Sequence, residues 1–189
     1  MRRFHFPVLP ALSRILILIC TCMVVNACQR EAAPGDSARH ILFVGNSLTY
    51  SNDLPGIVTT LAKAIGISVE TTTLAEPNYA HEDHWNDGKM EALIASGKFD
   101  FVLVQQGLSS QEDGRVMLLD YGARIKALCE KQHAKLAFFM VWPVRANAHT
   151  FTGVINNYRH AAIATESLLC RVGEVWKQHY DRTGDFSFY

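Results

Sequence analysis

The sequence predicts an α/β protein of three layers, α/β/α, with helices on both faces of a doubly wound parallel sheet. Two observations lead to this prediction. Apolar runs alternate along the chain with segments whose apolar residues recur at helical spacing, which is the pattern of repeated βαβ units. The clearest runs, at 41–44 and 99–104, are almost continuously apolar rather than alternating, as is typical of strands that helices cover on both faces.

The first predicted strand, 41–44, ends at Gly45 and leads into a polar, turn-prone segment. A helix is predicted over 55–65, because apolar residues recur there at helical spacing. This strand, turn and helix place Ser47 at the carboxyl edge of a sheet, where open α/β sheets hold their active sites. On these residues alone, Ser47 as a cap of the following loop or helix is an equally good interpretation.

The remaining elements follow the same alternation. A β-rich, partly alternating segment at 67–74 favours a strand near the sheet edge. Further strands are predicted at 99–104, 135–142 and 169–172. Further helices are predicted at 82–96, 117–129 and 151–168, with another helix opening at 173.

Short motifs at the strand ends resemble the SGNH (GDSL-like) hydrolases. The segment Gly45-Asn46-Ser47-Leu48-Thr49 is similar to the first block of that family, in a variant with Asn where many members have Asp. Gln106-Gly107 after the third strand and Trp142-Pro143 after the fourth resemble one subgroup. The resemblance covers residues 40–189 and implies a flavodoxin-like strand order with the first strand central.

The resemblance implies a serine esterase that needs no metal and no organic cofactor. Ser47 is the implied nucleophile, and the N–H groups of Ser47 and Asn78 and the side chain of Gln106 are the implied oxyanion-hole donors, with Ser109 as runner-up to Gln106. Asn78 stands where the family usually has glycine, and Asn tolerates left-handed backbone better than most residues. The implied substrate is a small ester or an acetylated carbohydrate.

The last block of the family, Asp-x-x-His, supplies the base that activates the serine, and Asp185 has Phe188 where the histidine would stand. We expect the domain to be incomplete at its carboxyl end, because the chain stops on an apolar run. A base from elsewhere, with His149 as a candidate, and an inactive protein are the alternatives. A lipid-anchored binding protein that holds a phosphate or carbohydrate at 46–49 is a further alternative.

His81 and His84 lie one helical turn apart and flank two carboxylates, which raises the question of a metal site. No other ligands cluster with them in the sequence. A helix start, with Glu82 and Asp83 near its positive end, is the better interpretation, so we expect no metal.

Residues 1–27 have the character of a lipoprotein signal. Arginines precede the apolar run 15–25, which is too short to span a bilayer comfortably, and Ala27 directly precedes Cys28, the expected lipidated residue. Residues 28–39 are predicted to be a flexible tether. The sequence therefore predicts export to the bacterial periplasm or outer membrane with a lipid anchor, and simple secretion or an uncleaved anchor are the alternatives.

Composition narrows the class of partner. The chain has 189 residues, 49% of them hydrophobic, which fits one globular domain with a sizeable core. It carries 18 basic and 18 acidic residues, without a basic run beyond its first residues, and this argues against nucleic acid as a partner. Cys129 in a predicted helix and Cys170 in a predicted strand are expected to be unpaired thiols.

Overall fold

The computed structural model describes residues 37–107 and 109–187; the signal at 1–27, Cys28 and most of the tether lie outside this part of the chain. At its centre is one five-stranded sheet with the order β2-β1-β3-β4-β5, in which all neighbouring strands are parallel. The expected flavodoxin-like order is confirmed, with β1 inside the sheet and β2 at an edge. The strands are β1 (Arg39–Gly45), β2 (Val69–Ala75), β3 (Phe101–Val104), β4 (Lys135–Phe139) and β5 (Leu168–Cys170).

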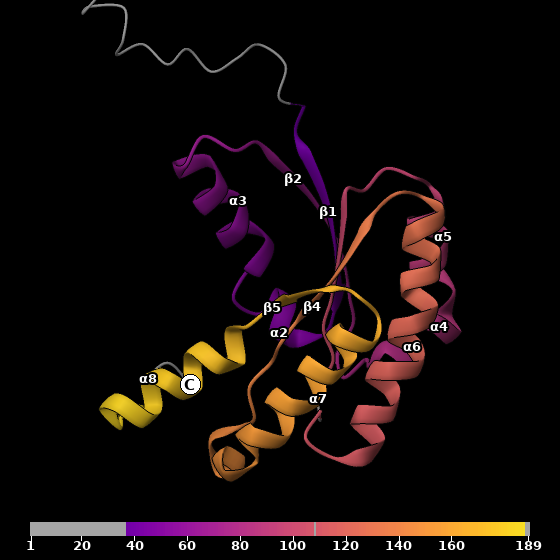
Figure 1. Cartoon of the computed structure of the whole chain (residues 1–189). Helices are drawn as coiled ribbons and strands as arrows, with labels where there is room; N and C mark the ends of the chain where they lie inside the picture. The colour runs from indigo at the N-terminus through magenta and orange to yellow at the C-terminus, as the bar shows by residue number, and fades with distance from the viewer. Residues whose placement is uncertain (1–36, 108, 188–189) are drawn as a thin grey trace, which may run out of the picture. The chain divides into compact units, whose positions relative to one another are not determined.

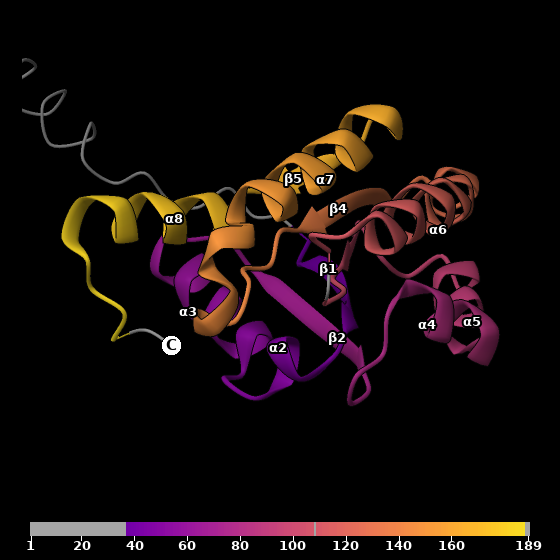
Figure 2. The same cartoon turned by 90° about the horizontal axis from the view of Figure 1, so that it is seen from below.

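Helices cover both faces of the sheet, which confirms the three layers (Figure 1). Helices α4 to α7 lie on one face, and α3 and α8 lie on the other, as Figure 2 also shows. This division follows from right-handed crossovers between parallel strands. The helices are α2 (Ser47–Tyr50), α3 (Leu54–Ala64), α4 (His81–Asp87), α5 (Lys89–Ala95), α6 (Glu112–Lys131), the 3-10 helix η1 (Arg145–Thr150), α7 (Phe151–Ala164) and α8 (Val172–Thr183). None of those in the described ranges is both long and apolar enough to cross a membrane.

The main core lies between the sheet and helices α4 to α7. Alternate residues of three neighbouring strands point into it, because successive side chains of a strand face opposite sides. These residues are Leu42, Val44, Val102, Val104, Leu136 and Phe138. On the other face the strands are less covered, and Ile41, Phe101 and Leu103 are only half-buried.

Three predicted helix boundaries were wrong. The helix predicted over 151–168 ends at Ala164, and Leu168 already belongs to β5. The helix predicted over 82–96 is broken into α4 and α5 at Gly88, whose φ of 77° ends the first helix in left-handed backbone. The helix predicted over 117–129 begins earlier, at Glu112, where two acidic residues in the first turn interact favourably with the helix dipole.

Helix α3 forms as predicted, but its apolar stripe does not face the core. Asp53 caps it by accepting a hydrogen bond from the Gly56 N–H at 3.1 Å. Ile57, Leu61 and Ile65 are nevertheless 47%, 63% and 73% exposed. Helical spacing therefore predicted the helix but not the surface that its apolar side meets.

The two thiols in the described part of the chain are unpaired, as predicted. Cys129 is fully buried in α6, and Cys170 is half-buried in β5. Burial raises the pKa of the Cys129 thiol to about 12, so this group is an inert core thiol rather than a nucleophile.

Candidate active site

Ser47 lies at the carboxyl ends of the parallel strands, as the sequence predicted. It opens α2 directly after β1 and lines a cavity of about 480 Å³. Loops that follow β1 to β4 all contribute to this cavity, so residues far apart in the sequence meet around the serine. Its wall includes Asn46, Asn78, Gly107, Ser109, Ser110, Val141 and Trp142.

The turn that carries Ser47 is held from below by Gln105, the first residue after β3. The Gln105 Oε1 accepts hydrogen bonds from the Asn46 N–H at 3.1 Å and from the Thr49 hydroxyl at 3.0 Å, while its Nε2 donates to Asn46 Oδ1 at 3.1 Å. Gly45 leaves room for this arrangement, because a Cβ there would collide with Thr49 Oγ1 and Gln105 Oε1. Gln105 thus fixes the serine turn. From the sequence alone, this role could not be told apart from simple capping of the strand.

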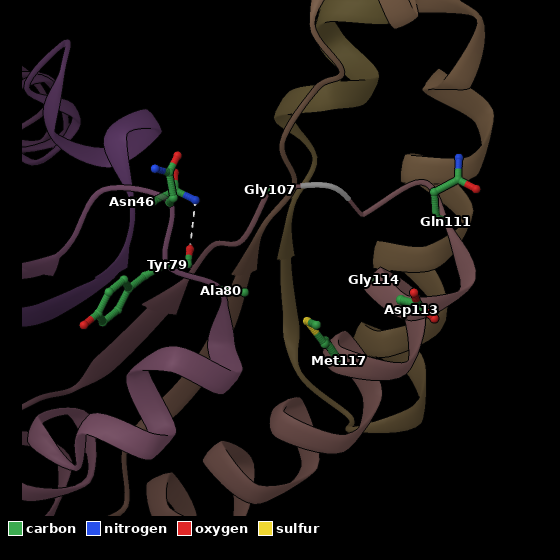
Figure 3. Close-up of a pocket in the computed structure, with 9 residues that line it drawn as sticks. Asn46, Tyr79, Ala80, Gly107, Gln111, Asp113, Gly114 and Met117 are labelled. Carbon is green, nitrogen blue, oxygen red and sulfur yellow. Dashed lines mark hydrogen bonds between the residues drawn. The ribbon is translucent and has the colours of Figure 1, made fainter.

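Asn46 joins the serine turn to the loop after β2. Its Oδ1 accepts a hydrogen bond from the Leu48 N–H at 3.2 Å, and its Nδ2 donates to the Tyr79 carbonyl at 3.0 Å (Figure 3). The Thr49 N–H donates to the Asn46 carbonyl at 2.8 Å. The backbone N–H groups of Leu48 and Thr49 therefore both have their hydrogen-bond acceptor in Asn46.

Asn78 has left-handed backbone, with a φ of 62°, as its residue type allowed. It lines the Ser47 cavity from the loop between β2 and α4. The structure thus brings Ser47 and Asn78 to one cavity, as expected of the two proposed amide donors. Their action on an oxyanion stays a prediction.

Gln106 is buried beside the cavities rather than in their walls. Its side chain is fully buried, accepts a hydrogen bond from the His81 N–H at 3.3 Å and donates to the Gly114 carbonyl at 3.0 Å. It lines neither of the two cavities beside the serine turn, whereas Gly107 lines both. In this arrangement the Gln106 side chain supports the loops around the site, and its action as an oxyanion donor stays a prediction. Ser109, the runner-up, does line the Ser47 cavity.

Helix α7 clamps the segment that follows β3. The buried Tyr158 hydroxyl donates to the Gln106 carbonyl at 2.8 Å and accepts from the Gln106 N–H at 3.3 Å. Burial raises the pKa of Tyr158 to about 12, so the phenol stays protonated and able to donate. The Asn157 Nδ2 donates to the Ser109 carbonyl at 2.8 Å. The sequence marked neither residue, since both lie in an ordinary helical pattern.

His81 and His84 are buried beneath the serine turn. The Nε2 of His84 makes a hydrogen bond with the Gly45 carbonyl at 2.8 Å. Burial lowers the pKa of both imidazoles, that of His81 to about 3 with a smaller contribution from His84. Both rings are therefore neutral at neutral pH, and His84 Nε2 is the donor. Within the described ranges, His, Cys, Asp and Glu form no group of three or more that could hold a metal ion.

The histidine residues in the described part of the chain do not line the Ser47 cavity. His149, the candidate base, lies exposed in η1. His179 belongs to α8, and its Nε2 lies 3.5 Å from Asp185 Oδ2. None of the described histidines therefore lies in the wall of the cavity that Ser47 lines.

A second cavity, of about 470 Å³, lies beside the first (Figure 3). The two cavities share Asn46, Asn78 and Gly107 as lining residues. Ala80 and Met117 add apolar surface to the second cavity, and it is of a size typical of sites for small molecules.

Comparison with known proteins agrees with this geometry. No family model and no curated protein sequence matches the chain. Among solved structures, a candidate SGNH hydrolase from Slackia heliotrinireducens is similar, with 20% identity, a TM-score of 0.63, and coverage of 75% of this chain and 83% of that one.

Two further solved structures are similar at lower identity. One is the lipase/acylhydrolase from Enterococcus faecalis, with 15% identity, a TM-score of 0.58, and coverage of 74% of this chain and 79% of that one. The other is AlinE4, an SGNH-hydrolase family esterase, with 16% identity, a TM-score of 0.57, and coverage of 78% and 82%. With its five-stranded parallel sheet in the order that the motifs implied, the chain has the SGNH hydrolase fold.

Proposed function

We propose that this chain is a serine hydrolase of small esters, in which Ser47 attacks the ester carbonyl. The observation that carries this proposal is the position of Ser47. It opens a rigidly hydrogen-bonded turn at the carboxyl end of an inner strand and faces a cavity that Asn78 also lines. Similar folds include proteins described as esterases, among them AlinE4 and EstA from Pseudoalteromonas sp..

In the proposed reaction, the Ser47 Oγ forms a bond to the carbonyl carbon and loses its proton to a base. The N–H groups of Ser47 and Asn78 stabilise the negative charge on the carbonyl oxygen. The alcohol then leaves with a proton, and water releases the acyl group from Ser47. The two adjoining cavities, which share Asn46, Asn78 and Gly107, are suited to hold the two halves of an ester on either side of that carbonyl.

The non-catalytic alternative receives less support. An anion held at 46–49 would need free amide groups at the start of α2, and the amides of Leu48 and Thr49 already bond to Asn46.

We also propose that the protein is exported and anchored through a lipid on Cys28, as the arginine-flanked apolar run before it indicates.

Labelling with a fluorophosphonate, which forms a covalent bond to nucleophilic serine residues, tests the nucleophile. We expect mass spectrometry of the full chain to find one adduct, on Ser47. We also expect Ser47→Ala to abolish the adduct. Because no described histidine lines the cavity, we expect slow hydrolysis of p-nitrophenyl acetate, since a triad without one member retains only about 10³–10⁴-fold catalysis over water.

Ser110→Ala is the matched control, because Ser110 lines the same cavity. It should keep both the adduct and the activity. An adduct of equal yield in Ser47→Ala, formed on another residue, would overturn the proposal. Tight binding of an acetylated carbohydrate without an adduct on Ser47 would favour the binding protein instead. A radioactive fatty acid should label the wild-type protein in a bacterial host but not Cys28→Ser, and an unlabelled, soluble wild-type protein would contradict the anchor.

A further inference from the structure

The amino-terminal ends of the strands form the end of the domain opposite α2, the helix that Ser47 opens (Figure 1). The strands start close together there, since the Arg39 N–H donates to the Ser68 carbonyl at 2.9 Å and the Lys135 N–H donates to the Asp100 carbonyl at 2.8 Å. Because all five strands are parallel, the cavities at their carboxyl ends open away from this end. The chain enters the domain here, from residue 37 into β1.

Large apolar side chains are exposed at this end. The last turn of α3 and the residues after it carry Leu61, Ile65 and Ile67, which are 63%, 73% and 41% exposed. The helix turns back tightly onto β2, with the Ile67 N–H bonded to the Ala62 carbonyl at 2.9 Å. The three side chains therefore belong to one rigid corner beside the entry of the chain.

Exposed lysines accompany these apolar side chains. Lys63 lies in the last turn of α3, Lys98 precedes β3, and Lys135 opens β4. None of the three makes an ion pair with a carboxylate in the described part of the chain.

Two of the acidic side chains in the described part of this end form ion pairs, since Asp100 lies 3.9 Å from Arg39 and Glu130 lies 3.5 Å from Lys126. Glu70 lies 3.6 Å from the ring of His40, which carries a charge only when it is protonated, and Glu166 lies beside β5. The three lysines exceed these two carboxylates, so this end carries an excess of positive charge together with exposed apolar side chains.

We propose that this end, defined by Leu61, Ile65, Ile67, Lys63, Lys98 and Lys135, is a membrane-contacting face that binds the surface of an anionic phospholipid bilayer. Large apolar side chains enter the headgroup region, and lysines beside them are attracted to anionic lipids. The face lies where the chain enters from the side of Cys28, the proposed lipid anchor, so anchor and face would act on the same bilayer. Contact there turns the Ser47 cavity away from the membrane.

A matched pair of tryptophan variants tests this orientation. The full chain is reconstituted with vesicles of phosphatidylethanolamine and phosphatidylglycerol, part of which carry brominated acyl chains that quench nearby tryptophan. Ile65→Trp reports on the proposed face, and Val144→Trp, at a 65% exposed position beside the Ser47 cavity, reports on the opposite end. We expect strong quenching of the fluorescence added at position 65 and none at position 144. The native tryptophan residues give the same background in both variants.

The lysines are tested in the Ile65→Trp background. Lys98→Gln with Lys135→Gln should weaken the contact by about 25-fold, at about fivefold for each lysine near an anionic surface. Lys89→Gln with Lys177→Gln makes the same change of charge at ion-paired positions elsewhere and should leave quenching unchanged. Vesicles of phosphatidylcholine alone, which carry no net charge, should lower the quenching at position 65 as much as Lys98→Gln with Lys135→Gln does.

Equal quenching at both positions, or none at position 65, would overturn the proposal. So would undiminished quenching in phosphatidylcholine, because the lysines would then have no role. Sedimentation could instead show dimers that form as the protein concentration rises. If position 65 is shielded from quenching in these dimers, the face belongs to contact with a second copy of the chain. All of these readouts are independent of ester hydrolysis, so they leave the proposed chemistry of Ser47 untouched.

Discussion

Removal of one hydroxyl group, in Tyr158→Phe, should destabilise the domain strongly while leaving its packing intact. The hydroxyl donates to the Gln106 carbonyl at 2.8 Å and accepts from the Gln106 N–H at 3.3 Å, in a fully buried environment. Without it, the buried Gln106 N–H loses its hydrogen-bond acceptor, whereas the Gln106 carbonyl keeps the hydrogen bond from the Ser109 hydroxyl at 3.3 Å. An unsatisfied buried donor costs about 1–3 kcal/mol and the second bond about 1 kcal/mol, so we expect a loss of about 2–4 kcal/mol.

Thermal unfolding followed by far-ultraviolet circular dichroism measures this loss. For a domain of this size, about 3 kcal/mol lowers Tm by roughly 10 °C. Tyr121→Phe is the matched control, because it removes the same group from a half-buried tyrosine whose hydroxyl bonds only the Glu82 carboxylate, at 3.0 Å. Its effect should be clearly smaller. Equal shifts for the two variants would refute the reasoning, since burial of the Gln106 backbone would then not determine the cost.

The same tyrosine gives a dependence on pH whose sign is fixed. The pKa of Tyr158 is raised from 10.0 to about 12, so between these values the unfolded chain has lost a proton that the folded chain keeps. Stability from this group is therefore complete below pH 10 and declines as the pH rises toward 12. The difference in stability between wild type and Tyr158→Phe should narrow by about 2–3 kcal/mol over this range. A constant difference would contradict the cause given for the shift.

Three further predictions concern the support of the serine turn. Because the pKa of His81 is lowered from 6.5 to about 3, the unfolded chain binds the extra proton between these values, and the free energy of unfolding of the wild type should fall by about 4–5 kcal/mol over this range. His81→Leu should flatten this decline in urea titrations, and an equally steep decline would contradict the cause given for the shift. Gly45→Ala should cost about 1–3 kcal/mol through the collision with Thr49 and Gln105, while Gly107→Ala, whose Cβ would meet no atom closer than 3.9 Å, should be tolerated. Gln106→Ala should lower stability but reduce turnover by less than the 10²–10³-fold expected for loss of a direct oxyanion donor, and a selective loss of that size would support the direct role.

The sequence by itself determined the layers of this fold and the place of its serine. Continuous apolar runs such as 41–44 can only be buried on both faces, so helices had to cover both sides of a parallel sheet. A strand that ends in glycine and a polar turn then puts Ser47 at the carboxyl edge. The residue type of Asn78 allowed left-handed backbone, but only the structure shows that Asn78 adopts it.

Only the tertiary structure decided which of two adjacent glutamines supports the serine turn. Gln105 and Gln106 look alike in the sequence, but successive side chains at a strand end point to opposite sides, and only Gln105 reaches Asn46 and Thr49. The sequence also did not predict the hydrogen bonds of Tyr158 to Gln106 or the exposure of the apolar side of α3. Periodicity shows that a helix has an apolar side, but what that side meets depends on neighbours that are distant in the chain.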